Sequence, residues 1–200
     1  MTKIANILSI LFQPLLSGFY CFILLAYTTD YLSAYTPIGR GVFLGIIILF
    51  TIIIPWSIML ISHKRGNISN LDISERKERT PIYLATITSM LLGDYLIFRL
   101  LGDYIFSYFM IFAIFAIAII TFINLFWKIS SHACGMGIVC GFIMYLALLF
   151  SYDYVYIFCL FVILSGAVVA SRLYLGKHTY GQVLAGFSLG FLPVICIMFL

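Results

Sequence analysis

Two histidines and several arginines lie in the polar breaks between long apolar runs of this sequence. Arg172 and His178 belong to the segment SRLYLGKHTYGQ, residues 171–182, and His132 ends the segment KISSH, residues 128–132. An imidazole can attack phosphorus or transfer a proton, and the planar guanidinium group matches the oxygens of a phosphate. These residue types predict chemistry on a phosphate group, with arginines rather than a metal ion balancing its charge.

A third polar segment, residues 63–80, adds Arg76, Lys77 and Arg79. Two apolar runs separate each polar segment from the next. If every run crosses a membrane, an even number of crossings returns the chain to the same side. We therefore expect the three segments to meet at one membrane surface.

The composition is that of an integral membrane protein. Hydrophobic residues make up 64% of the 200 residues and charged residues 9%, whereas a soluble domain carries about 25% charged residues. A helix of about 20 apolar residues spans a hydrocarbon core about 30 Å thick. The runs near this length are 4–27, 41–62, 81–101, 104–127, 133–150, 154–170 and 180–200. Because they are continuous rather than alternating, the sequence predicts an all-α fold, a polytopic transmembrane helical bundle of six or seven spans forming a single integral membrane domain over residues 1–200.

The first run, residues 4–27, is the one that leaves the number of spans open. Pro14 could kink it or lay its start along the membrane interface. Lys3 before an apolar stretch is typical of a signal peptide, but no small-residue cleavage site follows. We therefore expect this segment to be retained.

Cations are distributed unequally between the two membrane faces. Alternate assignment of seven spans leaves only Arg40 and Arg99 on one face. The other face carries nine: Lys3, Lys64, Arg65, Arg76, Lys77, Arg79, Lys128, Arg172 and Lys177. Cytoplasmic loops are enriched in Lys and Arg, so the nine-cation face is predicted to be cytoplasmic. Cations that bind an anionic substrate would bias this count, and removing three arginines for that reason still leaves six against two.

The spacing within residues 171–182 resembles a known motif. Ser171 and Arg172 are followed by five residues, His178, three residues and Gln182. The third motif of the type-2 phosphatidic-acid phosphatase superfamily, membrane lipid-phosphate phosphatases related to vanadium haloperoxidases, reads Ser-Arg, five residues, His, three residues, Asp. The segment ISSH that ends at residue 132 resembles its second motif, Pro-Ser-Gly-His. The segment RKERTP that begins at residue 76 lies where its first motif, a Lys followed seven residues later by Arg-Pro, is expected. The chain thus resembles a divergent bacterial-type member with a phosphatase-like core at 72–190.

The resemblance implies a role for each matched residue. His178 is the nucleophile that forms a phosphohistidine, and His132 is the general acid that protonates the departing lipid alcohol. The residues implied to bind phosphate are Arg172, Arg79, Arg76, Lys77, Ser130 and Ser171. The activity implied is that of a lipid phosphate phosphatase, which hydrolyses a phosphate monoester or diphosphate without a metal or cofactor.

The sequence departs from the family pattern in two motifs. Gln182 stands where the family has the Asp that holds the nucleophilic histidine, and its oxygen accepts the Nδ1 proton but supplies no charge. Loss of the analogous charge in a serine-protease triad costs about 10⁴ in rate, so we expect a working but slow enzyme unless Asp72, Glu75 or Glu78 substitutes. In the first motif, Asp72 stands seven residues before Arg79, where the family has Lys.

Small residues follow both histidines at helical spacing. A helix that begins near His178 places residues 178, 182, 186 and 190 on one face, and two of them are glycines. Gly137 and Gly141 offer the same kind of surface after the second motif. Small residues four apart let helix backbones approach closely. We therefore expect these two helices to pack together and bring the second motif beside the third.

Functions of other classes stay open. A catalytically silent member of the same fold would bind or move phosphorylated lipids without turnover, and Gln182 and the incomplete first motif favour it. An intramembrane prenyltransferase would need aspartate clusters to hold magnesium-diphosphate, and the corresponding stretch offers only Asp72. A small transporter would be expected to carry an inverted repeat, and the sequence shows none.

The remaining polar residues fit structural roles. The five cysteines are an odd number without C-x-x-C spacing, which favours buried thiols over a metal site or disulfides. The net charge of +4 forms no basic stripe of the kind that binds nucleic acid. Asp94 and Arg99 are expected at the membrane interface.

The partners expected from these patterns are the lipid bilayer and a phosphorylated lipid. The identity of that lipid and the oligomeric state are left open. The expected location is a bacterial inner membrane, which the chain would cross several times.

Overall fold

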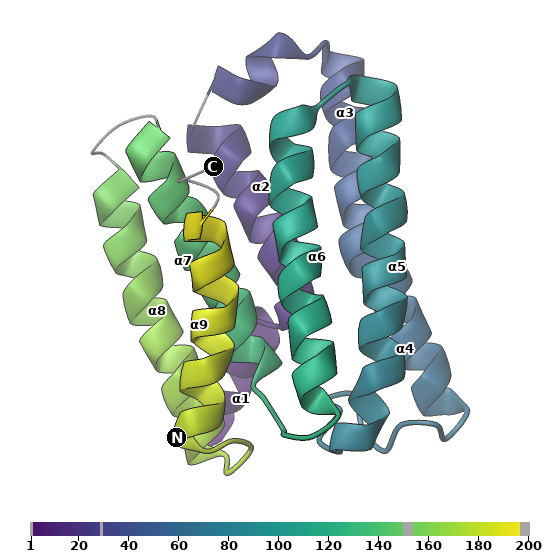
Figure 1. The fold of residues 1–200 in the computed structure, drawn as a ribbon, viewed down its shortest axis with the longest axis vertical. Coiled ribbons are helices and arrows are strands. Elements are labelled where there is room, and N and C mark those ends of the chain that lie inside the picture. The colour runs from purple at the N-terminus through teal and green to yellow at the C-terminus, as the bar shows by residue number, and fades with distance from the viewer. Residues whose placement is uncertain (1, 29, 150–153, 197–200) are drawn as a thin grey trace. The chain divides into compact units, whose positions relative to one another are not determined.

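The computed structural model describes residues 2–28, 30–149 and 154–196, and every regular element among them is helical (Figure 1). In chain order these are α1 (Thr2–Leu11), η1 (Pro14–Leu16), α2 (Ser17–Thr28), η2 (Asp30–Ala34), α3 (Pro37–Ile47), η3 (Ile48–Ile53), α4 (Ile54–Lys64), α5 (Arg76–Leu101), α6 (Tyr104–Asn124), α7 (Ser131–Leu149), α8 (Tyr154–Tyr174) and α9 (Tyr180–Cys196). The prediction of an all-α bundle is confirmed.

Six helical segments in the described part of the chain are long and apolar enough to cross a membrane. They are Thr2–Ala26, Pro37–Lys64, Arg76–Leu101, Phe106–Asn124, Ser131–Leu148 and Tyr154–Tyr174. The last helix, Tyr180–Cys196, is apolar but shorter. The protein is thus a multi-pass helical membrane protein, as expected for a bundle of six or seven spans.

The chain forms two compact units. Unit 1 comprises Met1–Ser17 and Lys128–Leu200, and unit 2 comprises Gly18–Trp127. The assignment of residues 1–200 to a single membrane domain stays a prediction.

In unit 2, the helix that runs from α3 through α4 contains a π-helical segment, η3, just before Pro55. In a π-helix each N–H bonds to the carbonyl five residues earlier, but Pro55 has no N–H to offer to the carbonyl of Phe50. The hydroxyl of Ser89, on α5, donates to that carbonyl at 2.6 Å. Gly93 gives Phe50 room, since a Cβ there would lie 2.7 Å from the Phe50 Cβ. The missing backbone donor is thus replaced from the neighbouring helix.

Unit 2 also contains the turn between α5 and α6, and these two helices lie side by side in Figure 1. Asp103 caps α6 by accepting a hydrogen bond from the amide of Phe106 at 2.9 Å. The same buried carboxylate accepts hydrogen bonds from the hydroxyls of Tyr31 and Tyr35. Burial, together with the Asp103 carboxylate, raises the pKa of both tyrosines, so both phenols remain donors. This cluster ties η2 to the α5–α6 turn.

In unit 1, α7 packs against both α8 and α9, and α1 packs against α8. Pro14 ends α1 because it has no N–H and pushes the preceding Gln13 into an extended conformation, with φ −64° and ψ 140°. The first apolar run is therefore interrupted at Pro14, as its sequence suggested. Together these helices position all residues of the predicted second and third motifs.

Candidate active site

The third motif spans the turn between α8 and α9, and its spacing is set by a helix-ending motif. Gly176 adopts φ +63°, a conformation that favours glycine. The amide of Gly176 donates to the carbonyl of Leu173, and the amide of Lys177 donates to the carbonyl of Arg172, both at 3.0 Å. These two bonds form a Schellman motif. They fix the short connection from Arg172 to His178.

The start of the next helix, α9, is held by the side chain of Gln182. Thr179 precedes α9, and the amide of Val183 bonds to its carbonyl at 3.2 Å. Gln182, three residues after Thr179, reaches back so that its Oε1 accepts from the Thr179 amide, also at 3.2 Å. This bond is one of the two that a capping box of the form Thr-x-x-Gln makes at a helix start. The start of α9 therefore fixes the direction of the Gln182 amide.

Gln182 also holds His178, whose ring is 7% exposed. Nδ1 of His178 lies 3.1 Å from Oε1 of Gln182. The Thr179 amide can only donate, which identifies the Gln182 atom at this position as the carbonyl oxygen. A carbonyl oxygen only accepts, so Nδ1 of His178 carries the proton and the neutral ring has its lone pair on Nε2. The expected contact between these two side chains is confirmed.

Arg172 and Ser171 lie in the last turn of α8 and are buried. Arg172 is 2% exposed and is among the largest fully buried side chains. A buried arginine is costly unless it is hydrogen-bonded and its charge is balanced. The hydroxyl of Ser171 donates to the carbonyl of Ala167 at 2.8 Å, which anchors this side chain to its own helix. Among the described residues of unit 1, the sequence contains no Asp or Glu; Asp153 lies outside them.

The second motif lies at the start of α7. Ser130 is fully buried, and its Oγ accepts a hydrogen bond from the amide of Ala133 at 3.3 Å, which caps α7. Its own amide donates to the carbonyl of Gln182 at 3.2 Å. The second and third motifs are thus joined through their backbones. A hydroxyl that accepts at a helix start keeps its O–H for another acceptor, which is compatible with the phosphate contact expected of Ser130.

His132, on the first turn of α7, is 7% exposed and faces the N-terminal helix. Its Nε2 lies 3.1 Å from the backbone carbonyl oxygen of Ser9. Because a carbonyl only accepts, Nε2 of His132 carries a proton. The sequence offered no local signal for this contact, since Ser9 lies in none of the three motifs.

Glycines allow α7 and α9 to pack closely. A Cβ at Gly186 would lie 2.4 Å from the carbonyl oxygen of Ser130, and one at Gly190 would lie 2.1 Å from that of Cys134. From the α7 side, a Cβ at Gly137 would lie 2.3 Å from the carbonyl oxygen of Phe187. Such distances exclude any side chain at these positions without movement of the backbone. The predicted packing of these two helices is confirmed.

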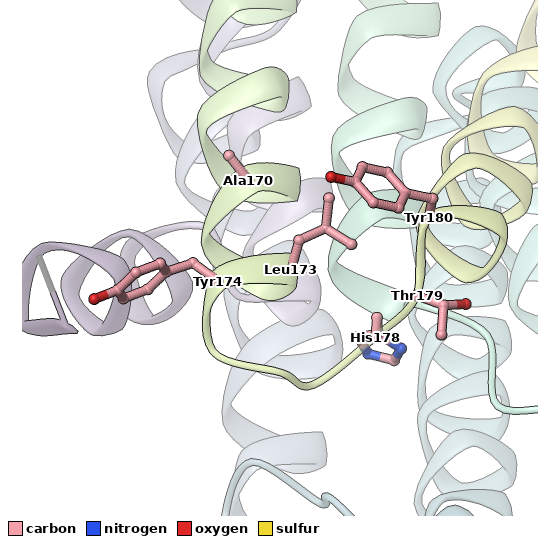
Figure 2. Close-up of a pocket in the computed structure, with 6 residues that line it drawn as sticks. All are labelled: Ala170, Leu173, Tyr174, His178, Thr179 and Tyr180. Carbon is pink, nitrogen blue, oxygen red and sulfur yellow. The ribbon is translucent and has the colours of Figure 1, made fainter.

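A pocket opens beside His178 (Figure 2). It has a volume of about 540 Å³ and is lined by Ala170, Leu173, Tyr174, His178, Thr179 and Tyr180. Leu173 from α8 and Tyr180 from α9 extend toward each other, while Tyr174 turns outward. Tyr174 and Tyr180 are 58% and 80% exposed. Apolar side chains and aromatic rings make up most of this lining, and His178 adds an imidazole.

The cations predicted from the first motif lie in unit 2, and two of them bond to backbone carbonyls. Arg76 donates from Nη1 to the carbonyls of Asn124 and Leu125 at the end of α6. Arg79 is 3% exposed, and its Nε donates to the carbonyl of Ile73 at 2.8 Å. These three bonds hold elements of unit 2 together. The expectation that these arginines join the phosphate site stays a prediction.

Lys77 and the three candidate carboxylates lie in the same part of unit 2. Lys77 and Asp72 are exposed. Glu78 accepts hydrogen bonds from the amide and hydroxyl of Ser69, at 3.0 and 3.1 Å. Glu75 precedes α5 and makes no side-chain cap. These bonds give Glu78, on α5, a structural partner in the preceding loop. The expected substitution for the family's Asp stays a prediction for all three carboxylates.

No family model, curated protein or solved structure matches the chain. Among the described residues, no group of three or more His, Cys, Asp or Glu side chains is placed to hold a metal ion. The candidate site of unit 1 thus consists of His178 with Gln182, the buried Arg172, and Ser130 and His132 at the start of α7.

Proposed function

We propose that the protein is a membrane phosphatase that hydrolyses a lipid phosphate monoester or diphosphate through a phosphohistidine on His178. The observation that carries this proposal is the hydrogen bond between Nδ1 of His178 and Oε1 of Gln182, at 3.1 Å. With the proton held on Nδ1, the lone pair is on Nε2. That nitrogen is then the nucleophile toward phosphorus.

The reaction takes two steps. Nε2 of His178 forms a bond to phosphorus while the bond from phosphorus to the lipid oxygen breaks, and imidazolium His132 gives its proton to that oxygen. Neutral His132 then takes a proton from water as the water oxygen bonds to phosphorus. The phosphorus–nitrogen bond breaks, its electron pair returns to Nε2 of His178, and inorganic phosphate leaves.

The buried Arg172 is suited to the oxygens of the transferred phosphoryl group, because its guanidinium presents a planar fork of donors. Ser130 can add a hydroxyl donor. Gln182 orients His178 but supplies no negative charge to the ring once it carries the phosphoryl group. A comparable loss of charge costs about 10⁴ in rate, whereas phosphate-monoester hydrolysis can be accelerated by up to about 10²¹. We therefore expect slow turnover rather than none.

The apolar pocket beside His178 supports a lipid substrate. Its lining by Ala170, Leu173 and Tyr180 suits the carbon atoms next to a phosphate ester better than it suits a polar head. Six helices among the described residues are long and apolar enough to cross a bilayer, in which such a lipid dissolves. We place the protein in a bacterial inner membrane as part of the same proposal.

A second candidate is a silent member of this fold that binds phosphorylated lipids without hydrolysing them. Two observations favour it: Gln182 carries no charge, and Arg76 of the incomplete first motif bonds to backbone carbonyls. Such a protein would bind the same lipids and release no phosphate.

The test is phosphate release by detergent-purified protein from a panel of lipid phosphates, in the presence of chelator. Native protein, His178→Ala and Gln182→Asp are compared. The proposal expects turnover that disappears in His178→Ala and rises in Gln182→Asp. Lipid binding without turnover in both the native protein and Gln182→Asp would establish the silent alternative, and turnover that survives in His178→Ala would exclude the phosphohistidine.

A further inference from the structure

The structure brings the N-terminal helix to the candidate site, although none of the motif residues comes from it. Within α1, Ala5 and Ser9 are buried, and their spacing of four residues places them on one helix face. Ile4, Ile7 and Ile10 are 62%, 55% and 68% exposed. The face that carries Ser9 is therefore the one turned toward the rest of unit 1.

The end of α1 leaves a carbonyl for His132 to bind. In a helix that continued past Leu11, the amide of Gln13 would bond to the carbonyl of Ser9. Pro14 ends the helix, and the amide of Gln13 donates instead to the carbonyl of Ile10 at 3.4 Å. Carbonyls in a last helical turn need donors from elsewhere, and Nε2 of His132 meets that of Ser9 at 3.1 Å. His132 thus caps α1.

The hydroxyl of Ser9 is a second feature of this contact. Ser9 is 8% exposed, and its Oγ is buried and makes no hydrogen bond among the residues that the structure describes. A buried hydroxyl without a partner costs about 1–3 kcal/mol. A polar group of a bound substrate would satisfy the Ser9 hydroxyl. The first turn of α7 and the last turn of α1 thus present an imidazole and a hydroxyl together.

We propose that Ser9 is a positioning residue for His132: its carbonyl keeps a proton on Nε2, so that Nδ1 is the nitrogen that exchanges a proton with the substrate. When His132 is an imidazolium, its Nδ1–H gives the proton to the leaving lipid oxygen. Its Nε2–H keeps its proton and remains hydrogen-bonded to the Ser9 carbonyl. Neutral His132 is then the Nε2–H form, and Nδ1 accepts the proton from water in the second step. The role of His132 as general acid rests on the proposed function, whereas its tautomer rests on the contact with Ser9 alone.

The two catalytic histidines are therefore expected in opposite neutral forms. His178 holds its proton on Nδ1 through Gln182, and His132 holds its proton on Nε2 through Ser9. His63, whose Nδ1 lies 3.1 Å from the carbonyl oxygen of Ile68, shares the form of His178. The chain has three histidines in all. Each one is thus visible as a separate signal in protein labelled with ¹⁵N-histidine.

Gly135 offers a way to disturb the contact from the side of α7. A Cβ there would lie 3.2 Å from the Cα of Pro14 and 3.6 Å from the Cβ of Ser17. Gly135→Val therefore pushes the chain that follows α1 away from α7. Gly166→Val, on α8, is the matched control, because a Cβ there would meet nothing within 4 Å. Ser9→Ala removes the hydroxyl and keeps the carbonyl.

The experiment records long-range ¹⁵N–¹H spectra of histidine-labelled protein in detergent, about two pH units above the ordinary histidine pKa of about 6.5, with signals assigned by single His→Asn variants. We expect Nε2–H for His132 in the native protein, in Ser9→Ala and in Gly166→Val. In Gly135→Val we expect His132 alone to average between its forms and kcat to fall about tenfold with KM unchanged.

Two results would overturn the inference: an Nδ1–H or averaged His132 in native protein, or an unchanged His132 signal in a folded Gly135→Val. If Gly135→Val does not fold, the native spectrum still decides. If the expected tautomers are observed but no lipid is hydrolysed, the contact between His132 and Ser9 is supported and the proposed function is wrong.

Discussion

The start of α9 in unit 1 and the start of α5 in unit 2 both carry charged or titratable side chains next to a polar turn, yet they use them differently. At α9, the Nδ1 of His178 bonds to the side chain of Gln182, and the pocket of about 540 Å³ lies beside it. At α5, Arg76 and Arg79 donate to backbone carbonyls of α6 and of the preceding loop.

A cluster of cations in a membrane loop is therefore weak evidence for a substrate site. A backbone carbonyl at a helix end attracts a guanidinium for the same electrostatic reason that a phosphate does. An imidazole that is held by a side chain and lines a pocket is more specific, because the contact with Gln182 determines both its orientation and its tautomer. The bonds of Arg76 and Arg79 to backbone carbonyls are structural contacts within unit 2, and catalysis by the residues of unit 1 stays a proposal.

The largest expected effect separates two histidines with similar Nδ1 contacts. His178→Ala should lower kcat by at least about 10³-fold, as expected for loss of a nucleophile. His63→Ala should leave kcat within about twofold and cost only about 1 kcal/mol of stability, the value of one hydrogen bond. Phosphate-release kinetics and thermal unfolding of both variants check this. Equal loss of turnover in the two would remove the distinction between the units.

Next in size is the effect of filling the helix contact in each unit. Gly190→Ala should destabilise the protein by about 3 kcal/mol or more, at the upper end for overpacking, because its Cβ meets the backbone of Cys134 at 2.1 Å. Gly93→Ala should cost about 1 kcal/mol, since its Cβ meets the side chain of Phe50, which can move. Thermal unfolding in detergent measures both. A larger loss for Gly93→Ala would contradict the rigid α7–α9 contact.

Two arginine variants distinguish a role in catalysis from a role in stability. Arg79→Lys should lower stability by about 2 kcal/mol, since a buried donor to Ile73 is lost and that residue has a strained φ of +42°. Arg172→Lys should lower kcat/KM by about 10²-fold through loss of the planar fork on phosphate. Stability and turnover are measured for both variants. A 10²-fold loss of turnover in a fully stable Arg79→Lys would return Arg79 to the phosphate site.

The smallest expected effect concerns the end of α6. Arg76→Ala should destabilise the protein by about 1 kcal/mol, because Nη1 no longer satisfies the carbonyls of Asn124 and Leu125. Lys77→Ala, at an exposed neighbouring position, should change stability by less than about 0.5 kcal/mol. Unfolding of the two variants, measured side by side, checks this. Equal stabilities would show that the α6 cap contributes nothing measurable.

The helical membrane fold and the local geometry around His178 follow from the amino-acid sequence. Long apolar runs leave the backbone no partner except itself, so helices follow from hydropathy alone. Gly176 ends α8, and Thr179 with Gln182 begins α9, through bonds between residues at most five positions apart. The small residues at 186 and 190 likewise predicted a close helix contact, because only glycine leaves room for a neighbouring backbone.

The hydrogen-bond partners that are distant in sequence depend on how the helices pack. Nothing near Ser9 in the sequence indicates that its carbonyl binds His132, a residue 123 positions later. Nothing near Arg76 indicates that it caps α6, 48 positions away. Both contacts arise because a helix end exposes carbonyls that any nearby donor can satisfy, and only the packing of helices determines which donor is near. Spacing therefore predicts chemistry within one turn of the chain, whereas the partners across the bundle come from the fold.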